Sequence, residues 1–161
     1  YLILLAKKIF SNSNLLIKAS LTIALVEIIW QLSLVFPYGD AYYNEIIQFL
    51  YPTNIDKQFE IEYWGPPYRQ AANWLNQNAD PNSIVCVPIA EHLLQFYPTR
   101  PDIHYACAKN SNYLMFITRW TYMPSDVERY FSFSDLSPIF TIKRLNSDLL
   151  RIYKLDGQTQ T

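Results

Sequence analysis

The sequence predicts an α/β fold behind a membrane anchor: a transmembrane helix, then a small extracytoplasmic α/β domain with a short-stranded sheet. Apolar residues crowd the first 36 positions, whereas polar and turn-forming residues dominate afterwards. The later part alternates helix-like stretches with short apolar runs bounded by turn residues, as in α/β domains. We therefore divide the chain into a membrane segment (1–36), an extracytoplasmic domain (37–155) and a polar tail (156–161) expected to be disordered.

The membrane segment is predicted to contain one complete spanning helix, residues 15–36. This stretch has about the twenty apolar residues needed to cross about 30 Å of hydrocarbon. Residues 1–6 look like the end of a preceding membrane helix, so we expect the sequence to continue something longer. The basic residues near the span all lie at one end of it: Lys7, Lys8 and Lys18. Positive charge marks the cytoplasmic side, so 7–14 is expected inside and everything after Pro37 outside a plasma or inner membrane.

Two polar residues interrupt the apolar span. Glu27 lies near its middle, where a carboxylate costs a few kcal/mol unless it is neutral or paired. Gln31 follows one turn later on the same face. We favour a polar seam directed at other membrane helices, in the same protein or in partner subunits. The alternatives are an amphipathic core helix of a soluble protein and a helix packed on a missing partner.

The domain after Pro37 is expected to form alternating short helices and strands. Proline is tolerated in the first turn of a helix, a Ser-x-x-Glu pattern caps one, and period-two alternation indicates a half-buried strand. The elements predicted on these grounds are a short helix lying on the membrane surface in 40–50, an extended or strand run at 59–63, a helix from Pro66 to about Ala79, a strand at 83–87, a short helix at 91–97, a strand at 113–118, a helix at 125–131, and a hairpin of 139–144 and 149–154.

Composition excludes several classes of function. The net charge is −1 and no basic stripe is present, so nucleic acid is not an expected partner. Only three glycines occur, far apart, whereas a phosphate-cradling loop needs several close together. No cofactor is therefore evident. For Cys86 and Cys107 we favour buried thiols over the disulfide that an oxidising compartment would permit.

Candidate chemical groups are sparse, and we predict no catalytic residue and no metal site. The only loose cluster with metal-ligand chemistry is His92, Asp102, His104 and Cys107. It lacks the paired close spacings of zinc sites and is better explained as ordinary loop residues. Glu60 and Glu62 share a strand face, as paired catalytic carboxylates would. A solvated strand face explains them equally well, and we prefer that interpretation.

Two segments resemble a known family. The sequence FPYGDAYYNE (36–45), directly after the predicted span, resembles the exit of the last membrane helix in C-type, polyprenyl-phosphate-sugar-dependent membrane glycosyltransferases, which include relatives of protein O-mannosyltransferases and aminoarabinose transferases. FEIEYWG (59–65), followed by YRQAANWLN (68–76) and SIVCV (83–87), is similar to a second block of that family. The resemblance covers roughly 15–155. The family often has a Gly-Gly pair where IIQFL (46–50) stands here.

This resemblance implies a role beside the membrane rather than catalysis. The family's catalytic acid lies in a first outer loop, upstream of anything in this chain, so 37–161 would be a roof on the acceptor side of an enzyme that takes sugar from a lipid carrier. The residues that would lie nearest the membrane, and could contact sugar or lipid headgroups, are Tyr38, Tyr42, Asn44, Tyr63 and Trp64. The same residues could simply attach the domain to its last helix.

Two other functions stay open. A short native protein with one or two membrane helices and no catalytic apparatus would be an accessory or structural subunit of a membrane complex. A soluble α/β binding protein, with 15–36 buried in its core, is the third. The expected partners under the first two hypotheses are membrane lipid and other membrane helices, with a lipid-linked sugar added under the transferase hypothesis.

Overall fold

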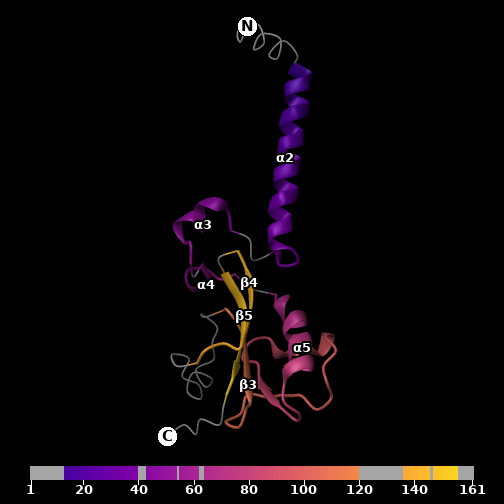
Figure 1. The fold of residues 1–161 in the computed structure, drawn as a ribbon, viewed down its shortest axis with the longest axis vertical. Helices are drawn as coiled ribbons and strands as arrows, with labels where there is room; N and C mark the ends of the chain where they lie inside the picture. Colours follow the sequence, from indigo (N-terminus) through magenta and orange to yellow (C-terminus); the bar gives the residue numbers. More distant parts are fainter. Residues whose placement is uncertain are drawn as a thin grey trace. The chain divides into compact units, whose positions relative to one another are not determined.

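A computed structural model describes residues 13–39, 43–53, 55–61, 64–119, 136–145 and 147–155 (Figure 1). The chain divides into two compact units, Tyr1–Phe36 and Pro37–Thr161. The first unit has one long apolar helix within its described residues. The second is a small mixed α/β domain built on a five-stranded sheet.

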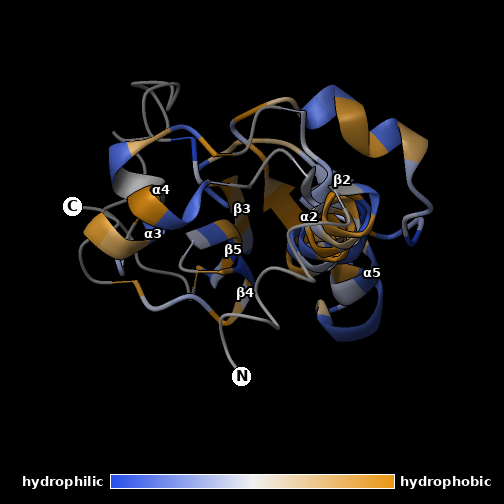
Figure 2. Cartoon of the chain, turned by 90° about the horizontal axis from the view of Figure 1, so that it is seen from above, coloured by the Kyte–Doolittle hydropathy of each residue, from blue (hydrophilic) through white to orange (hydrophobic). Residues whose placement is uncertain are grey.

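The long helix α2 spans Ser13–Val35, as the apolar run at 15–36 predicts. Within Asn14–Val35 the most apolar window of 18 residues has a mean hydropathy of 1.8, so by length and composition the helix could cross a membrane. Large apolar side chains are exposed all around the helix, and Figure 2 colours most of it as hydrophobic. An all-round apolar helix has no polar face to turn towards water. No residue of its most apolar 18-residue window is buried.

The sheet has the strand order β2-β1-β3-β5-β4. Strands β1 (Ile84–Cys86), β2 (His104–Tyr105) and β3 (Tyr113–Ile117) run parallel, and β3 pairs antiparallel with β5 (Ser147–Lys154). Strand β4 (Phe140–Arg144) completes the closing hairpin with β5. Every residue of β3 is buried, because this central strand is covered on both faces. The strands predicted at 83–87 and 113–118 and the final hairpin are confirmed.

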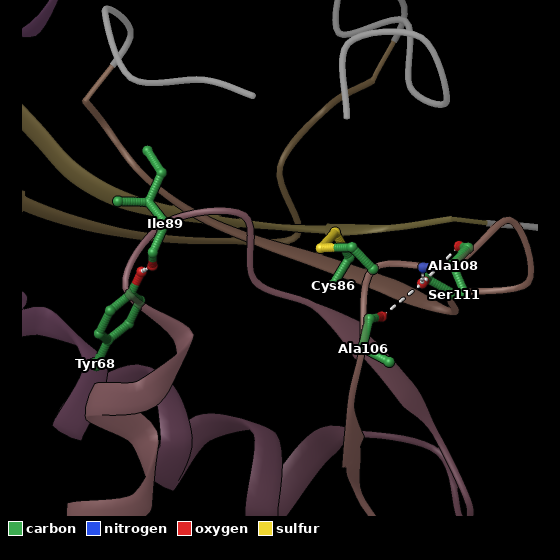
Figure 3. The surroundings of a disulfide bond; sticks show 7 residues. Tyr68, Cys86, Ile89, Ala106, Ala108 and Ser111 are labelled. Carbon is green, nitrogen blue, oxygen red and sulfur yellow. Dashed lines mark hydrogen bonds between the residues drawn. A yellow bond between two sulfur atoms is a disulfide. The ribbon is translucent and has the colours of Figure 1, made fainter. Parts of the chain in front are cut away.

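Helix α5 (Pro67–Asn78) packs its apolar face into the core and contacts β5. The prolines predict its start: Pro67 occupies the first helical turn, where its missing N–H costs nothing. The buried face repeats at helical spacing: Tyr68, Ala71, Ala72 and Leu75 are all fully buried. The hydroxyl of Tyr68 donates a hydrogen bond to the carbonyl of Ile89, which ties the helix to the loop after β1 (Figure 3).

Three short helices complete the described part of the domain: α3 (Glu45–Leu50), α4 (Ile55–Gln58) and the 3₁₀ helix η2 (Glu91–Phe96). The short helices expected in 40–50 and 91–97 are confirmed. Helix α4 was not predicted, because one turn carries too little periodicity to recognise. The run 59–63 does not join the sheet within its described residues 59–61. The helix predicted at 125–131 and the tail at 156–161 lie outside the described residues.

The preference for free thiols is wrong. Cys86 of β1 and Cys107, just beyond β2, form a disulfide with an S–S distance of 2.07 Å. The two parallel strands bring these residues together, because β1 pairs with β2 at Ile84–His104 and Val85–Tyr105. The adjoining turn is held by Ser111, whose hydroxyl contacts the carbonyl oxygens of Ala106 at 3.1 Å and Ala108 at 2.8 Å (Figure 3).

Candidate functional site

An open groove of about 510 Å³ lies along the outward side of α5, within the domain. We call it the α5 groove. It is lined by two prolines, two tyrosines, two amides and one arginine: Pro37, Tyr38, Pro66, Arg69, Gln70, Asn73 and Tyr97.

The helix itself explains why polar residues line this groove. Pro66, Arg69 or Gln70, and Asn73 recur three to four positions apart, so they share one face of α5. The opposite face carries the buried residues that pack on the sheet. The amphipathic helix thus places a guanidinium and two amides on the groove wall as a consequence of burying its apolar side.

Tyr38 is the predicted site residue that the structure brings into the groove. Its side chain is buried, with 3% of its surface exposed. The phenol donates a hydrogen bond of 2.6 Å to the side-chain oxygen of Gln70. The guanidinium of Arg144 lies 4.8 Å from the centre of its ring, which is a cation–π distance. Tyr38 is therefore a fixed wall of the groove.

The other predicted site residues are not brought to the groove. Asn44 caps α3, since its side-chain oxygen accepts from the Ile47 amide at 3.0 Å. Trp64 is 73% exposed and does not line the groove. Tyr42 and Tyr63 lie outside the described residues. The sequence-based set therefore contributes one described groove residue.

Arg69, Asn73 and Tyr97 line the groove but were missed from the sequence. The signal for Arg69 and Asn73 was present, because YRQAANWLN alternates polar and apolar residues with helical period. Arg69 is exposed, and none of the ion pairs within the described ranges involves it. No acidic residue is among the described residues that line the groove. The groove therefore has a cation and several hydrogen-bonding groups.

The glutamates of the membrane and domain segments have local partners. The amide of Gln31 donates to the carboxylate of Glu27 at 2.8 Å, one helical turn away. Glu60 lies 3.5 Å from the guanidinium of Arg119, two residues after the end of β3, so these two side chains form an ion pair. Glu62 lies outside the described residues. The partners of Glu27 and Glu60 are therefore an amide and a guanidinium.

Two residues of the loose cluster with metal-ligand chemistry, Asp102 and Cys107, have structural partners instead. Asp102 accepts from the guanidinium of Arg100 at 2.7 Å and from the backbone amide of Asn82 at 3.0 Å. Arg100 also donates to the carbonyl of Ala79 at 3.1 Å, just past the end of α5. Cys107 is bonded to Cys86 in the disulfide and is not a free thiolate ligand. Among the residues described, no group of three His, Cys, Asp or Glu side chains could hold a metal ion.

The Arg100–Asp102 pair predicts a specific acid sensitivity. Its hydrogen bonds lower the pKa of Asp102 from 3.8 to about 2. Because the folded pKa is depressed, the stabilisation is complete above the unfolded value and is lost as pH falls towards 2. Asp102→Asn should therefore flatten the fall in unfolding free energy between about pH 4 and pH 2. Denaturant titrations across that range test this, with the exposed Glu91→Gln as control; an unchanged slope in Asp102→Asn would contradict it.

Helix α3 presents an apolar face without burying any of its residues. Ile46, Phe49 and Leu50 are 69%, 83% and 60% exposed. Their spacing of three and four places them on one side. The residues at each end hold the helix in place: the Tyr43 and Tyr51 rings pack 5.1 and 5.4 Å from that of Phe59. The apolar face is thus held outward.

Comparison with known proteins identifies no relative: no family model, no curated protein and no solved structure matches this chain.

Proposed function

We propose that this chain is the membrane-anchored C-terminal region of a glycosyltransferase that uses a polyprenyl-phosphate-linked sugar. In this proposal the domain is a roof on the acceptor side and supplies no catalytic residue. The observation that carries the membrane part is α2: an apolar helix with no buried residue in its most apolar 18-residue window, followed in the sequence by a separate α/β unit. Soluble domains bury such helices, whereas membrane proteins place them in lipid.

The disulfide supports an extracytoplasmic domain. Disulfides persist in oxidising compartments and are rare in the cytosol. The bond between Cys86 and Cys107 joins the sheet to its own edge region and leaves no free cysteine among the described residues. This agrees with the side predicted from the lysines at the start of the span.

The exposed face of α3 supports a domain that lies against the membrane. Three large apolar side chains on one turn and a half of helix would be costly in water, at about 25 cal/mol per Å² of apolar surface. Helix α3 begins nine residues after Phe36, so the chain places it within reach of the bilayer surface. A lipid interface would accept this face.

The transferase part of the proposal depends on the resemblance of 36–45 and 59–87 to the C-type glycosyltransferases. Gly65, the last residue of the FEIEYWG segment, has a φ of 74°, and a Cβ there would lie 2.8 Å from Leu93 and 2.9 Å from Tyr68. Glycine at this position therefore lets the chain enter α5 closely packed on η2. This packing explains physically why a glycine stands at position 65 in the segment that resembles the family.

Residues 1–161 alone, purified in detergent, are expected to transfer no sugar from a polyprenyl-phosphate donor to an acceptor. Such transfer needs a base or charge-stabilising carboxylate beside the acceptor, and the resemblance places that group upstream. Release of radiolabelled product measures it. Turnover that Glu60→Gln abolishes, with circular dichroism unchanged, would contradict the assignment of Glu60 to a structural ion pair.

An activity assay of the protein expressed from the complete reading frame distinguishes the transferase hypothesis from the accessory-subunit hypothesis. If the complete protein transfers sugar and loses that activity when an upstream outer-loop carboxylate is changed, the transferase proposal is supported. If the complete protein has no donor-dependent activity and co-purifies with a membrane complex, the accessory function replaces it.

A further inference from the structure

The α5 groove has the charge of an anion site. Arg69 is its one described cation, and no carboxylate lines it within the described ranges. The side-chain oxygen of Gln70 accepts the hydrogen bond from the Tyr38 phenol, so the side-chain NH₂ of Gln70 can donate to a ligand. Asn73 adds a second amide. Arginine prefers phosphate because its planar fork can donate two parallel hydrogen bonds to it.

Two residues of the groove follow α2 closely in the sequence. Pro37 and Tyr38 line the groove and stand two and three residues after Val35, the last residue of α2. Three residues span at most about 11 Å. The headgroup layer on each side of the hydrocarbon is roughly 5–8 Å thick. If α2 spans the bilayer, the wall formed by Tyr38 lies at or just above the headgroups.

We propose that the α5 groove binds the phosphate of a membrane lipid, with Arg69 as its charge partner and Gln70 and Asn73 as hydrogen-bond donors. The location rests on the proposed function, whereas the phosphate preference rests on the lining residues. A neutral sugar would leave the guanidinium charge unpaired, so phosphate is the better match. Two lipids carry that chemistry: a polyprenyl phosphate and an anionic glycerophospholipid.

The test is binding of defined lipids to the full chain in detergent micelles, read by native mass spectrometry. The probes are a short polyprenyl phosphate, the matching polyprenol without phosphate, and phosphatidylglycerol. The variants are Arg69→Gln and, as control, Lys109→Gln, an exposed cation outside the groove. We expect Arg69→Gln to weaken phosphate-lipid binding roughly ten- to hundredfold, as for a lost charged hydrogen bond. Lys109→Gln should change it little.

Each outcome decides the inference. Preference for polyprenyl phosphate over polyprenol, lost in Arg69→Gln alone, supports the site. Binding of phosphatidylglycerol as well would identify bulk phospholipid as the ligand, and its absence would identify the carrier lipid. Equal binding of polyprenol and its phosphate, or equal loss in both variants, would overturn the inference. This assay needs no sugar transfer, so failure of the transferase proposal would appear separately, in the activity of the complete protein.

Discussion

Phe116→Ala should lower the unfolding free energy of the domain by about 3–5 kcal/mol. Phe116 is fully buried in β3, the central strand, whose five residues all pack in the interior. Truncation removes the ring and leaves a cavity that a close-packed sheet fills only in part. Domains of this size have about 5–15 kcal/mol of total stability, so the variant should be close to unfolding.

Phe96→Ala is the matched control for this change. Phe96 lies at the end of η2 and is 71% exposed, so the same truncation should cost no more than about 0.5 kcal/mol. Chemical denaturation of the full chain in detergent, followed by near-ultraviolet circular dichroism, measures both. Equal losses in the two variants would show that β3 is not the centre of the core.

Loss of the disulfide should cost about 3 kcal/mol of unfolding free energy. Cys86 and Cys107 are separated by 21 positions, and closing a loop of that length removes conformational entropy from the unfolded chain. The double variant Cys86→Ala with Cys107→Ala should therefore unfold at lower denaturant concentration than the wild type.

Reductant provides the control for that comparison. It should destabilise the wild type and leave the double variant unchanged, because only the wild type has a bond to lose. If reductant shifts neither protein, the cysteines are not joined, and one support for an extracytoplasmic domain is removed.

The sequence predicts those elements whose pattern is local. Helix α5 has prolines at its start and a clean apolar face, and the β4–β5 hairpin has two apolar runs around a polar turn. Both were predicted to within two or three residues at each end. Strand β2 has only two residues, His104 and Tyr105, which is too short for a periodic pattern to predict it. The run 59–63 alternates like a strand, yet its described residues 59–61 pair with none.

The disulfide and the groove could not be predicted because they depend on tertiary arrangement. Cys86 and Cys107 meet only once β2 pairs with β1. Tyr38 was predicted from its place after the span, but its partner Gln70 is 32 positions away. Trp64 was included for its aromatic character, and the structure leaves it exposed. Residue type alone selected the candidate site residues. Which of them lie in one groove depends on how α5 packs in the folded domain.

The measurement that tests the central claim most directly is the side of the membrane on which each end of α2 lies. Gln77→Cys, on the exposed part of α5, and Asn14→Cys, at the start of the span, each add one thiol to the disulfide-bonded chain. A membrane-impermeant maleimide is applied to intact cells and then after lysis. We expect Gln77→Cys to react in intact cells and Asn14→Cys only after lysis. Labelling of Gln77→Cys only after lysis, or release of the chain into the soluble fraction, would contradict a membrane-anchored extracytoplasmic domain.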